Sequence, residues 1–353
     1  MRAGSDVGAC RAVGQAGRDV GGRCGVMLHA SSPGIAAVPS VDRRRFLGML
    51  AAVAAAGPAL AAGRRFDART TAEQATADLD LSGRVVLVTG ATSGIGAETA
   101  RVLALRGAHV LATGRTLESA RAACAAFPGR ATPLALELSD LESVAACADA
   151  VAALDAPLDA PLDALVCNAG IVLGDHQTVR GLELQFAVNH LGHFLLVNRL
   201  LPRVLAAPQG RVVVLGSGDH GRAPKGGIQF DDLSGKAWHA QGYAHSKLAN
   251  GLFSLELARR LEGTRATSNA VTPGHTRTRI LRHVGSRYRD DARPVAEAAA
   301  TPCWLAVHPD AAGFNGQWFR DFAVAEQDPM QRDRAMAARL WQVSEALVAA
   351  DRV

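Results

Sequence analysis

The sequence predicts an α/β fold in which a doubly wound parallel sheet carries helices on both faces, as a single domain over residues 83–353. Two patterns lead to this class. From Arg84 onward, short apolar runs alternate with longer amphipathic ones, and a glycine-rich segment follows the first apolar run directly. Strands that alternate with helices need right-handed crossovers, which place the strands parallel and cover both faces of the sheet.

The apolar runs give the strands in order. The predicted strands are residues 84–89, 109–113, 132–138, 163–170, 211–217 and 267–274, with a candidate edge strand at 317–319. A helical pattern over about 95–105 follows the first strand. Residues 154–165 repeat a four-residue unit, which we interpret as an insertion in a surface loop, because lengthening a loop costs little entropy.

The N-terminal region differs from this domain in composition. Residues 1–40 show no periodicity and are expected to be a disordered or untranslated extension. Residues 41–62 pair arginines with a weakly apolar, alanine-rich run, which is typical of a twin-arginine-type signal segment, and residues 63–82 are expected to be a linker. This pattern predicts export to a bacterial periplasm. The alternative is a cytoplasmic protein with an arginine-rich tail.

Charge and cysteine content limit the possible functions. The formal net charge is +5, but residues 1–65 hold nine arginines, no lysine and three aspartates, so the remainder is close to neutral. A nucleic-acid partner is therefore not expected. The apolar run 46–62 is short and broken by glycine and proline, so no transmembrane span is expected. The six cysteines follow neither a disulfide nor a metal-knuckle spacing.

The segment TGATSGIG (89–96) lies between the first strand and the first helix. Amide groups at a helix N-terminus suit a pyrophosphate, and glycines permit the tight turn and the close approach of phosphate. In this context the segment predicts a Rossmann-type dinucleotide site. The expected contact residues are Gly90, Thr92, Ser93, Gly94, Ile95 and Gly96.

Arg115 follows the second strand, where dinucleotide folds place the residue that contacts the adenosine ribose. An acid there favours NAD, whereas an arginine accommodates the 2′-phosphate of NADP. The first acid in this sequence is Glu118, so we expect NADP, with NAD as the less favoured cofactor. The alternative is that Arg115 is only a solvated surface residue.

Tyr243 and Lys247 are four residues apart at the start of a helical pattern that appears strongly amphipathic. This spacing sets both side chains on one helix face. A neighbouring ammonium lowers the pKa of a phenol, which would allow Tyr243 to act as a general acid/base.

With these motifs, the chain resembles the short-chain dehydrogenase/reductase family over roughly residues 80–350. The matching pieces are TGATSGIG, CNAG (167–170), VNHLGHF (188–194), GS (216–217), YAHSK (243–247) and PGHTRT (273–278), in the family's order. The gap between Ser217 and Tyr243 and the tail 316–347 resemble the retinol-dehydrogenase-like branch.

The resemblance implies a catalytic tetrad of Asn189, Ser217, Tyr243 and Lys247. Tyr243 would be the acid/base, Ser217 would hydrogen-bond the substrate oxygen, Lys247 would hold the nicotinamide ribose, and Asn189 would position a water. Further cofactor contacts are implied for Glu137, Leu138, Asn168, Ala169, Gly170 and Thr278. No metal site is expected, because His190 and His193 lack an acidic partner at ligand spacing.

The implied activity is NADP-dependent interconversion of a lipophilic alcohol with its aldehyde or ketone. The alternative is a catalytically silent sensor or scaffold. A homo-oligomer is a further expectation. Six arginines over 277–293 suggest an anionic partner, which is either a carboxylate or phosphate of the substrate or an anionic membrane surface in a peripheral contact. The alternative is that these arginines form a solvated helix face. The chain departs from the family pattern at Glu137, Cys167, Gly216 and Asp219, and the Asp219 carboxylate would repel anionic substrates.

Overall fold

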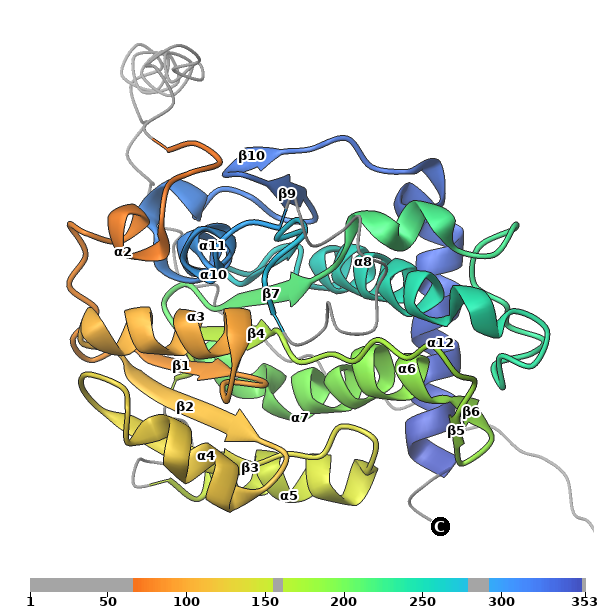
Figure 1. The fold of residues 1–353 in the computed structure, drawn as a ribbon, viewed down its shortest axis with the longest axis horizontal. Coiled ribbons are helices and arrows are strands. Elements are labelled where there is room, and N and C mark those ends of the chain that lie inside the picture. Colours follow the sequence, from red (N-terminus) through yellow and green to blue (C-terminus); the bar gives the residue numbers. More distant parts are fainter. Residues whose placement is uncertain (1–65, 155–160, 279–291, 351–353) are drawn as a thin grey trace, which may run out of the picture. The chain divides into compact units, whose positions relative to one another are not determined.

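The computed structural model describes residues 66–154, 161–278 and 292–350 (Figure 1). The extension 1–40, the signal segment 41–62 and half of the four-residue repeat, residues 155–160, lie outside the described residues. So do four of the six arginines of 277–293, at positions 279, 282, 287 and 289. Cleavage of a signal segment and export therefore stay predictions.

An eight-stranded sheet forms the centre of the domain. Its strand order is β10-β9-β8-β7-β4-β1-β2-β3, and every pair is parallel except β9 with β10. The strands are β1 (Val85–Val88), β2 (His109–Gly114), β3 (Ala131–Ala135), β4 (Ala164–Cys167), β7 (Arg211–Leu215), β8 (Thr267–Val271), β9 (Trp318–Arg320) and β10 (Ala323–Val324). The predicted doubly wound fold is confirmed. The candidate edge strand at 317–319 is β9, which is internal because β10 pairs with its outer side.

Helices cover both faces of this sheet (Figure 1). One face carries α3 (Gly94–Leu105), α4 (Leu117–Cys124) and α11 (Ala300–Val307), and the other carries α5 (Leu141–Ala152), α7 (Gly192–Ala206) and α8 (Gly242–Arg260). The long helix α12 (Arg334–Ala350) packs against α8. The shorter elements are α2 (Ala72–Ala75), α6 (Leu184–Phe186), α10 (Val295–Ala298) and the hairpin of β5 (Thr178–Val179) with β6 (Leu182–Glu183).

The central strands are apolar on both faces because both are covered. In β1, Val86 and Val88 face the core under α3 and α11, whereas Leu87 faces the core under α5 and α7, and all three are fully buried. Successive side chains of a strand point to opposite faces, so a doubly covered strand is a continuous apolar run rather than an alternating one.

The sheet changes direction between β1 and β4. The chain runs outward from β1 to β2 and β3, then returns to β4 on the other side of β1 and continues to β7 and β8. At such a switch point the loops after the two neighbouring strands diverge, and a crevice opens at their carboxyl ends. The glycine loop 89–96 and the segment 168–170 leave β1 and β4 at this point.

Residues 66–82, expected to be part of a linker, pack as part of the domain. Thr71 begins α2 with a capping box: its hydroxyl accepts from the amide of Gln74, whose side chain accepts from the amide of Thr71. Ala72 and Ala75 are buried against α11 and α3. This short helix therefore adds to the core.

The helix that begins near Tyr243 is not the amphipathic surface helix that its sequence suggests. Most residues of α8 are buried, polar ones such as Ser246, Asn250 and Glu256 included. The reason is that strands β7 and β8, helix α12 and the turn 218–222 surround it. Polar residues of α8 that the sequence pattern would place in solvent therefore make buried hydrogen bonds instead.

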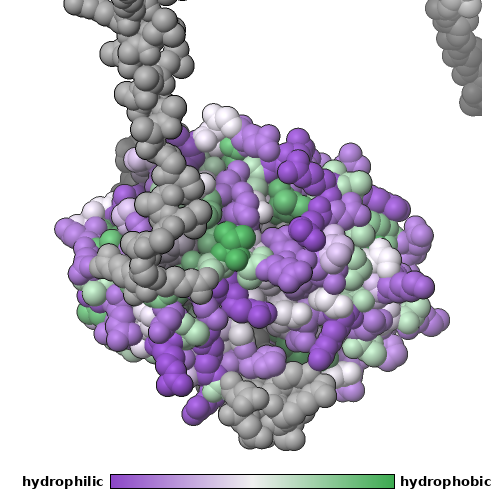
Figure 2. Space-filling view, turned by 90° about the horizontal axis from the view of Figure 1, so that it is seen from above, coloured by the Kyte–Doolittle hydropathy of each residue, from purple (hydrophilic) through white to green (hydrophobic). Residues whose placement is uncertain are grey.

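The described surface is largely polar. Figure 2 shows hydrophilic residues over most of the coloured face, with hydrophobic ones in small groups. The large hydrophobic side chains that are exposed among the described residues are Leu105, Leu117, Leu205 and Val324, on four separate elements. Of the helices described, none has the length and hydrophobicity needed to cross a membrane.

The packing of α12 on α8 predicts that Trp341 is important for stability. Its ring lies 4.9 Å from that of Phe194 and under the guanidinium of Arg260 at 4.1 Å, with 3% of the residue exposed. Replacement by alanine leaves a cavity, so we expect Trp341→Ala to lower the free energy of unfolding by about 3–5 kcal/mol in urea titration. The exposed Gln342→Ala in the same helix is the control and should change it by less than about 0.5 kcal/mol. Equal effects of the two variants would contradict this docking.

Candidate active site

The glycine loop has the space that a dinucleotide phosphate requires. Gly90 and Gly94 adopt φ of 66° and 59°, which residues with a Cβ rarely adopt. A Cβ at Gly96 would lie 2.4 Å from the carbonyl oxygen of Gly90, so helix α3 can approach the loop only with glycine there. Ser93 precedes α3, and among the described residues its hydroxyl accepts no bond from the first turn. The first-turn amides, with Ile95 among them, thus suit a phosphate, and the loop fits the predicted cofactor.

The segment after β4 is fastened to this loop by Thr89, a residue that sequence reasoning did not single out. The Thr89 hydroxyl accepts hydrogen bonds from the amides of Asn168 and Ala169, both at 2.9 Å. The side-chain amide of Asn168 donates to the Thr89 carbonyl at 2.8 Å. Asn168 and Ala169 therefore lie beside the glycine loop, whereas a Cβ on Gly170 would lie 3.1 Å from Oδ1 of Asn189 and 3.5 Å from the Lys247 ammonium.

His193 completes this network from the opposite helix layer. Its Nδ1 lies 3.0 Å from the Asn189 carbonyl oxygen, which can only accept, so Nδ1 carries the proton. Burial lowers the pKa of His193 to about 4, and the neutral ring then accepts the Thr89 hydroxyl proton at Nε2, 2.9 Å away. His193 thus joins the Asn189 backbone to the carboxyl ends of β1 and β4. Among the described residues no metal-binding cluster includes it or His190.

The predicted cofactor contacts from the other segments also surround the loop. Thr278, which follows β8, lies next to Gly94: a Cβ placed on this glycine would be 3.0 Å from the threonine side chain. Thr92 lies next to Gly114 at the end of β2, where a Cβ would be 2.7 Å from the Thr92 side chain. Arg115 follows Gly114 and is exposed. Tertiary structure therefore brings these residues to one edge of the sheet from sequence positions more than 180 apart.

Glu137 and Leu138 lie after β3 at the same edge. Glu137 uses one carboxylate oxygen to accept from the amide and hydroxyl of Ser139, at 3.0 and 2.7 Å. Leu138 is buried against Gly192 at the start of α7, where a Cβ would lie 2.4 Å from the Leu138 carbonyl oxygen. Glu137 is partly exposed.

Asn189 lies in a π-helical turn, Ala187–Leu191, and is fully buried. Its Oδ1 accepts from the Ile171 amide at 2.8 Å, and its Nδ2 donates to the Ile171 carbonyl and the Ser246 hydroxyl, both at 3.0 Å. Both amide protons are therefore used within the protein. The side chain fixes the loop after β4 to α8, so its amide group cannot also donate to a water.

Lys247 is held against the end of β7. Its ammonium donates to the carbonyl oxygen of Leu215 at 3.0 Å, and Asn250 donates to the same oxygen at 3.0 Å. Both side chains are almost fully buried. Burial lowers the pKa of Lys247 to about 8. Asn250 could have been found in the sequence, since it follows Tyr243 by seven residues and Lys247 by three and so shares their helix face.

Ser217 follows the same strand end. Its hydroxyl accepts from the Asp219 amide at 3.2 Å, and its carbonyl oxygen lies 2.7 Å from Nδ1 of the buried His220. The Asp219 carboxylate lies 3.5 Å from the Ser217 hydroxyl and 3.3 Å from the Arg222 guanidinium. A serine, a carboxylate and an arginine thus occupy a single turn, Gly218–Arg222 and the residue before it.

Tyr243 lies between Ser217 and Lys247. The Lys247 ammonium is 5.7 Å from the centre of the phenol ring. Burial raises the pKa of Tyr243 to about 12; a hydrogen bond with Ser217 lowers it, and the Asp219 charge raises it further. The lowering of this pKa that the sequence suggested for Lys247 is therefore not found in the protein alone, where the loss of hydration by the phenolate dominates.

Gly216, a departure from the family pattern, is explained by Trp318 of β9. A Cβ at Gly216 would lie 2.3 Å from two atoms of the Trp318 ring, which is 1% exposed. The same ring packs against His220 at 4.9 Å between centroids. Trp318 therefore supports the turn that carries Ser217, and only glycine fits before that serine.

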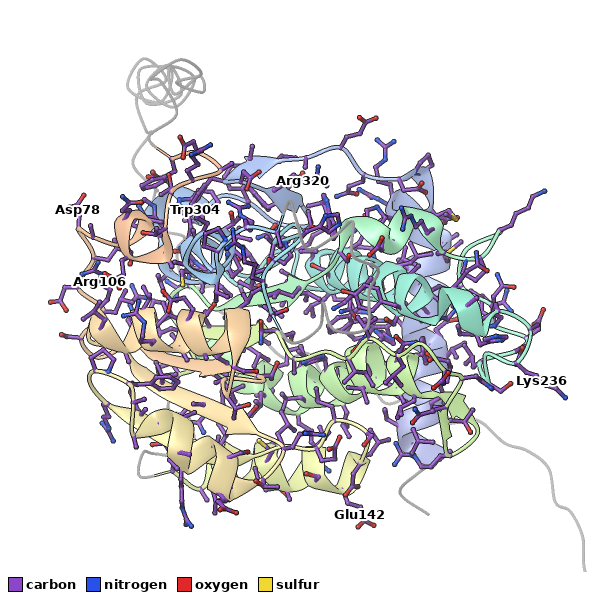
Figure 3. The ribbon with its side chains drawn as sticks, in the orientation of Figure 1. Asp78, Arg106, Glu142, Lys236, Trp304 and Arg320 are labelled. Carbon is purple, nitrogen blue, oxygen red and sulfur yellow. The ribbon has the colours of Figure 1, made fainter. Side chains whose placement is uncertain are left out.

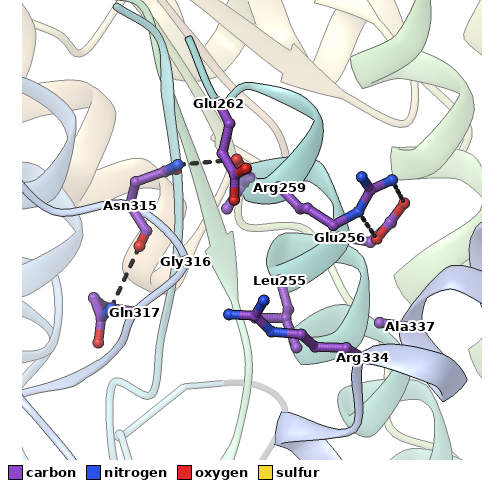
Figure 4. Close-up of a pocket in the computed structure, with 10 residues that line it drawn as sticks. Leu255, Glu256, Arg259, Glu262, Asn315, Gly316, Gln317, Arg334 and Ala337 are labelled. Atoms are coloured by element: carbon purple, nitrogen blue, oxygen red, sulfur yellow. Dashed lines mark hydrogen bonds and ion pairs between the residues drawn. The ribbon is translucent and has the colours of Figure 1, made fainter. Parts of the chain in front are cut away.

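A hollow of about 110 Å³ lies in a different part of the domain, between α8, α12 and the segment before β9 (Figure 4). It is lined mainly by charged and amide side chains, among them Glu256, Arg259 and Arg334. Glu256 is already paired with Arg259 and Arg260, at 2.7 and 2.9 Å. None of the predicted site residues lines it, so we assign it no part in the chemistry.

Comparisons with known proteins agree with this geometry. Residues 84–289 match the family model described as short chain dehydrogenase. Retinol dehydrogenase 12 of Bos taurus is 39% identical over 281 residues, 76% of this chain and 87% of that protein. The crystal structure of an uncharacterized protein from Mycobacterium paratuberculosis matches with a TM-score of 0.64 and 32% identity, covering 78% of this chain and 97% of that one. A short chain dehydrogenase from Shigella flexneri, complexed with NADP, matches with a TM-score of 0.53 and 26% identity, covering 68% and 97%.

The contact between Gly216 and Trp318 gives a testable coupling. We expect Gly216→Ser to destabilise the protein by about 1–3 kcal/mol, because the buried indole cannot move away. Adding Trp318→Leu should recover part of this loss, with a coupling energy above about 1 kcal/mol in a double-mutant cycle of urea unfolding. Gly218→Ala is the control, since a Cβ there meets only the Arg320 guanidinium at 3.5 Å. Additive effects of the two substitutions would refute the steric explanation.

Proposed function

This chain belongs to the short-chain dehydrogenase/reductase family of NAD(P)-dependent oxidoreductases, and we propose that it interconverts a carbonyl compound and its alcohol with Tyr243 as the acid/base. The observation that carries the proposal is the meeting of Tyr243, Ser217 and Lys247 at the carboxyl end of β7, beside the glycine loop. An oxidoreductase of this kind needs a proton donor and acceptor close to a bound nicotinamide.

In carbonyl reduction the phenol of Tyr243 donates its proton to the substrate oxygen, and in alcohol oxidation it takes one back. Ser217 hydrogen-bonds the same oxygen and stabilises the charge that develops on it. Lys247 supplies a positive charge near the phenol, and Leu215 holds that ammonium in place. The nicotinamide, when bound, supplies or accepts the hydride.

We propose NADP as the preferred cofactor. Support comes from Arg115, which is exposed at the end of β2 beside Thr92, where a 2′-phosphate would lie. Arginine suits this role because its planar guanidinium binds phosphate through two hydrogen bonds. The Shigella flexneri relative whose structure contains NADP is consistent with this choice.

The substrate proposed is a lipophilic alcohol, aldehyde or ketone, on the basis of the similarity to retinol dehydrogenase 12. The two described arginines of 277–293 are engaged within the domain, since Arg277 donates to the Ala292 carbonyl and Arg293 pairs with Asp321 at 2.6 Å. They do not support the membrane contact considered from the sequence. A homo-oligomer stays a prediction.

Removing the phenolic oxygen tests the acid/base assignment. Tyr243→Phe should keep its fold and its nicotinamide affinity while turnover falls by about 10²–10⁴-fold, the usual contribution of a general acid/base. Turnover is followed by nicotinamide absorbance with a panel of aldehydes and alcohols. A variant that keeps more than about a tenth of the rate would rule out Tyr243, and absence of turnover in the unmodified enzyme would favour the silent sensor.

The raised pKa of Tyr243 sets the pH dependence. Alcohol oxidation needs the deprotonated phenol, whose fraction increases as pH rises toward the pKa. We therefore expect kcat/KM for oxidation to increase with pH between 6 and 8, and that for reduction, which needs the protonated form, to stay nearly constant. The comparison is made with one alcohol–aldehyde pair at constant ionic strength, and opposite trends would contradict the assignment.

Cofactor preference gives a further test. We expect NADP to exceed NAD at least about tenfold in kcat/KM, equivalent to about 1.4 kcal/mol. Arg115→Ala should reduce this ratio by raising KM for NADP while that for NAD changes little. Arg121→Ala, which removes an exposed arginine of the following helix α4, is the matched control. An unchanged ratio in Arg115→Ala would exclude this residue as the 2′-phosphate contact.

A further inference from the structure

A carboxylate that the proposed reaction does not use lies close to the proposed reacting atoms. Asp219 lies two residues beyond Ser217, and its side chain is 28% exposed. One oxygen, Oδ2, is 3.5 Å from the Ser217 hydroxyl, and the other, Oδ1, is 3.3 Å from Arg222. An acid so placed is unfavourable for a reaction in which negative charge develops on the substrate oxygen, so its presence calls for a role.

The distance from this carboxylate to a substrate is limited by Ser217. A substrate oxygen hydrogen-bonded to Ser217 lies about 3 Å from its hydroxyl, so it lies within about 6.5 Å of Oδ2. The charge of Asp219 also reaches Tyr243, since it raises the pKa of that phenol. The 3.5 Å distance to Ser217 thus places the Asp219 charge within reach of the reacting group, and the direction of the Tyr243 shift agrees with it.

The turn that bears Asp219 is rigid. The Asp219 amide donates to Ser217, and the His220 ring, buried against Trp318, is hydrogen-bonded to the Ser217 carbonyl. These backbone bonds keep the Asp219 side chain next to Ser217. By contrast Arg222, the ion-pair partner, is 63% exposed on its side-chain surface, so water screens its charge more strongly.

Two cationic side chains among the described residues also lie near Tyr243 and the turn that bears Asp219. Lys247 approaches Tyr243 from α8, and the Arg320 guanidinium of β9 lies over Gly218. Both are cationic, so a site without Asp219 would attract anions. We infer that Asp219 is a specificity-determining residue that excludes substrates with a carboxylate or phosphate close to the reacting carbon and admits neutral or cationic ones. This inference rests on the proposed roles of Ser217 and Tyr243.

The size of the effect follows from Coulomb's law. A substrate charge about 8 Å from the carboxylate, at an effective dielectric constant of about 40, changes kcat/KM by about fivefold. The effect should decrease as salt is raised, because exposed charges are screened within about 10 Å at 0.1 M ionic strength. Asp219 would therefore give specificity by repelling anionic substrates, and not by binding one particular substrate more tightly.

The test compares three aldehydes of the same skeleton: 4-carboxybenzaldehyde, 4-carbamoylbenzaldehyde and 4-(trimethylammonio)benzaldehyde. Asp219→Asn should raise kcat/KM for the anionic aldehyde relative to the neutral one by about fivefold and lower it for the cationic one. Asp219→Ser serves as a second neutral variant. Arg222→Gln should lower kcat/KM for the anionic aldehyde and raise it for the cationic one, each relative to the neutral aldehyde, and by a smaller factor than Asp219→Asn.

Glu142→Gln is the matched control, because it removes the same charge from the exposed first turn of α5. Figure 3 shows Glu142 on the opposite side of the molecule from Arg320. Its ratios should equal those of the unmodified enzyme. The pH profile is a second readout, since loss of the Asp219 charge should move the increase in alcohol oxidation to lower pH.

The outcomes separate this inference from the proposed function. If Tyr243→Phe is inactive while Asp219→Asn and Asp219→Ser leave the three-aldehyde ratios and the pH profile unchanged, Asp219 does not set specificity and only this inference fails. If Tyr243→Phe remains active, the proposed function itself fails. Opposite shifts in the Asp219 and Arg222 variants, reduced by salt, establish the inference.

Discussion

The carbonyl oxygen of Leu215 is the atom on which the arrangement of the site depends. Leu215 is the last residue of strand β7, and its carbonyl oxygen accepts hydrogen bonds from both Lys247 and Asn250 of helix α8. A buried ammonium is costly unless its hydrogen bonds are satisfied, so this contact fixes the helix against the strand. Because Ser217 follows the strand and Tyr243 lies one turn before Lys247, the same contact sets their separation.

A second buried network connects this centre to the cofactor loop. His193 donates to the backbone of Asn189 and accepts from Thr89, whose hydroxyl holds the amides of Asn168 and Ala169. The Asn189 carbonyl can only accept and the amides of Asn168 and Ala169 can only donate, so each hydrogen bond of this network has a single possible direction. The two halves of the site are therefore coupled through buried and partly buried polar groups, and hydrogen bonds are stronger in such surroundings than in water.

The electrostatics of the protein alone oppose ionisation of the proposed acid/base. Burial raises the pKa of Tyr243 to about 12 and lowers that of Lys247 to about 8. Both shifts have one cause, the loss of hydration by the charged form. Asp219 acts on Tyr243 in the same direction, whereas the hydrogen bond from Ser217 acts against it. The site therefore holds a protonated tyrosine ready to donate, which suits a reaction that delivers a proton to oxygen.

The sequence by itself determined the doubly wound fold and the positions of the cofactor loop and of Tyr243 with Lys247. These follow from short-range rules: apolar runs make strands, φ above zero needs glycine, and a spacing of four shares a helix face. Tertiary structure alone decided the rest. It packed residues 66–82 onto the domain through Ala72 and Ala75, enclosed a helix expected to be amphipathic, explained Gly216 by Trp318, and brought Thr89 and His193 into the site. Such contacts join residues far apart in sequence, and no local pattern records which polar side chain will be buried against which.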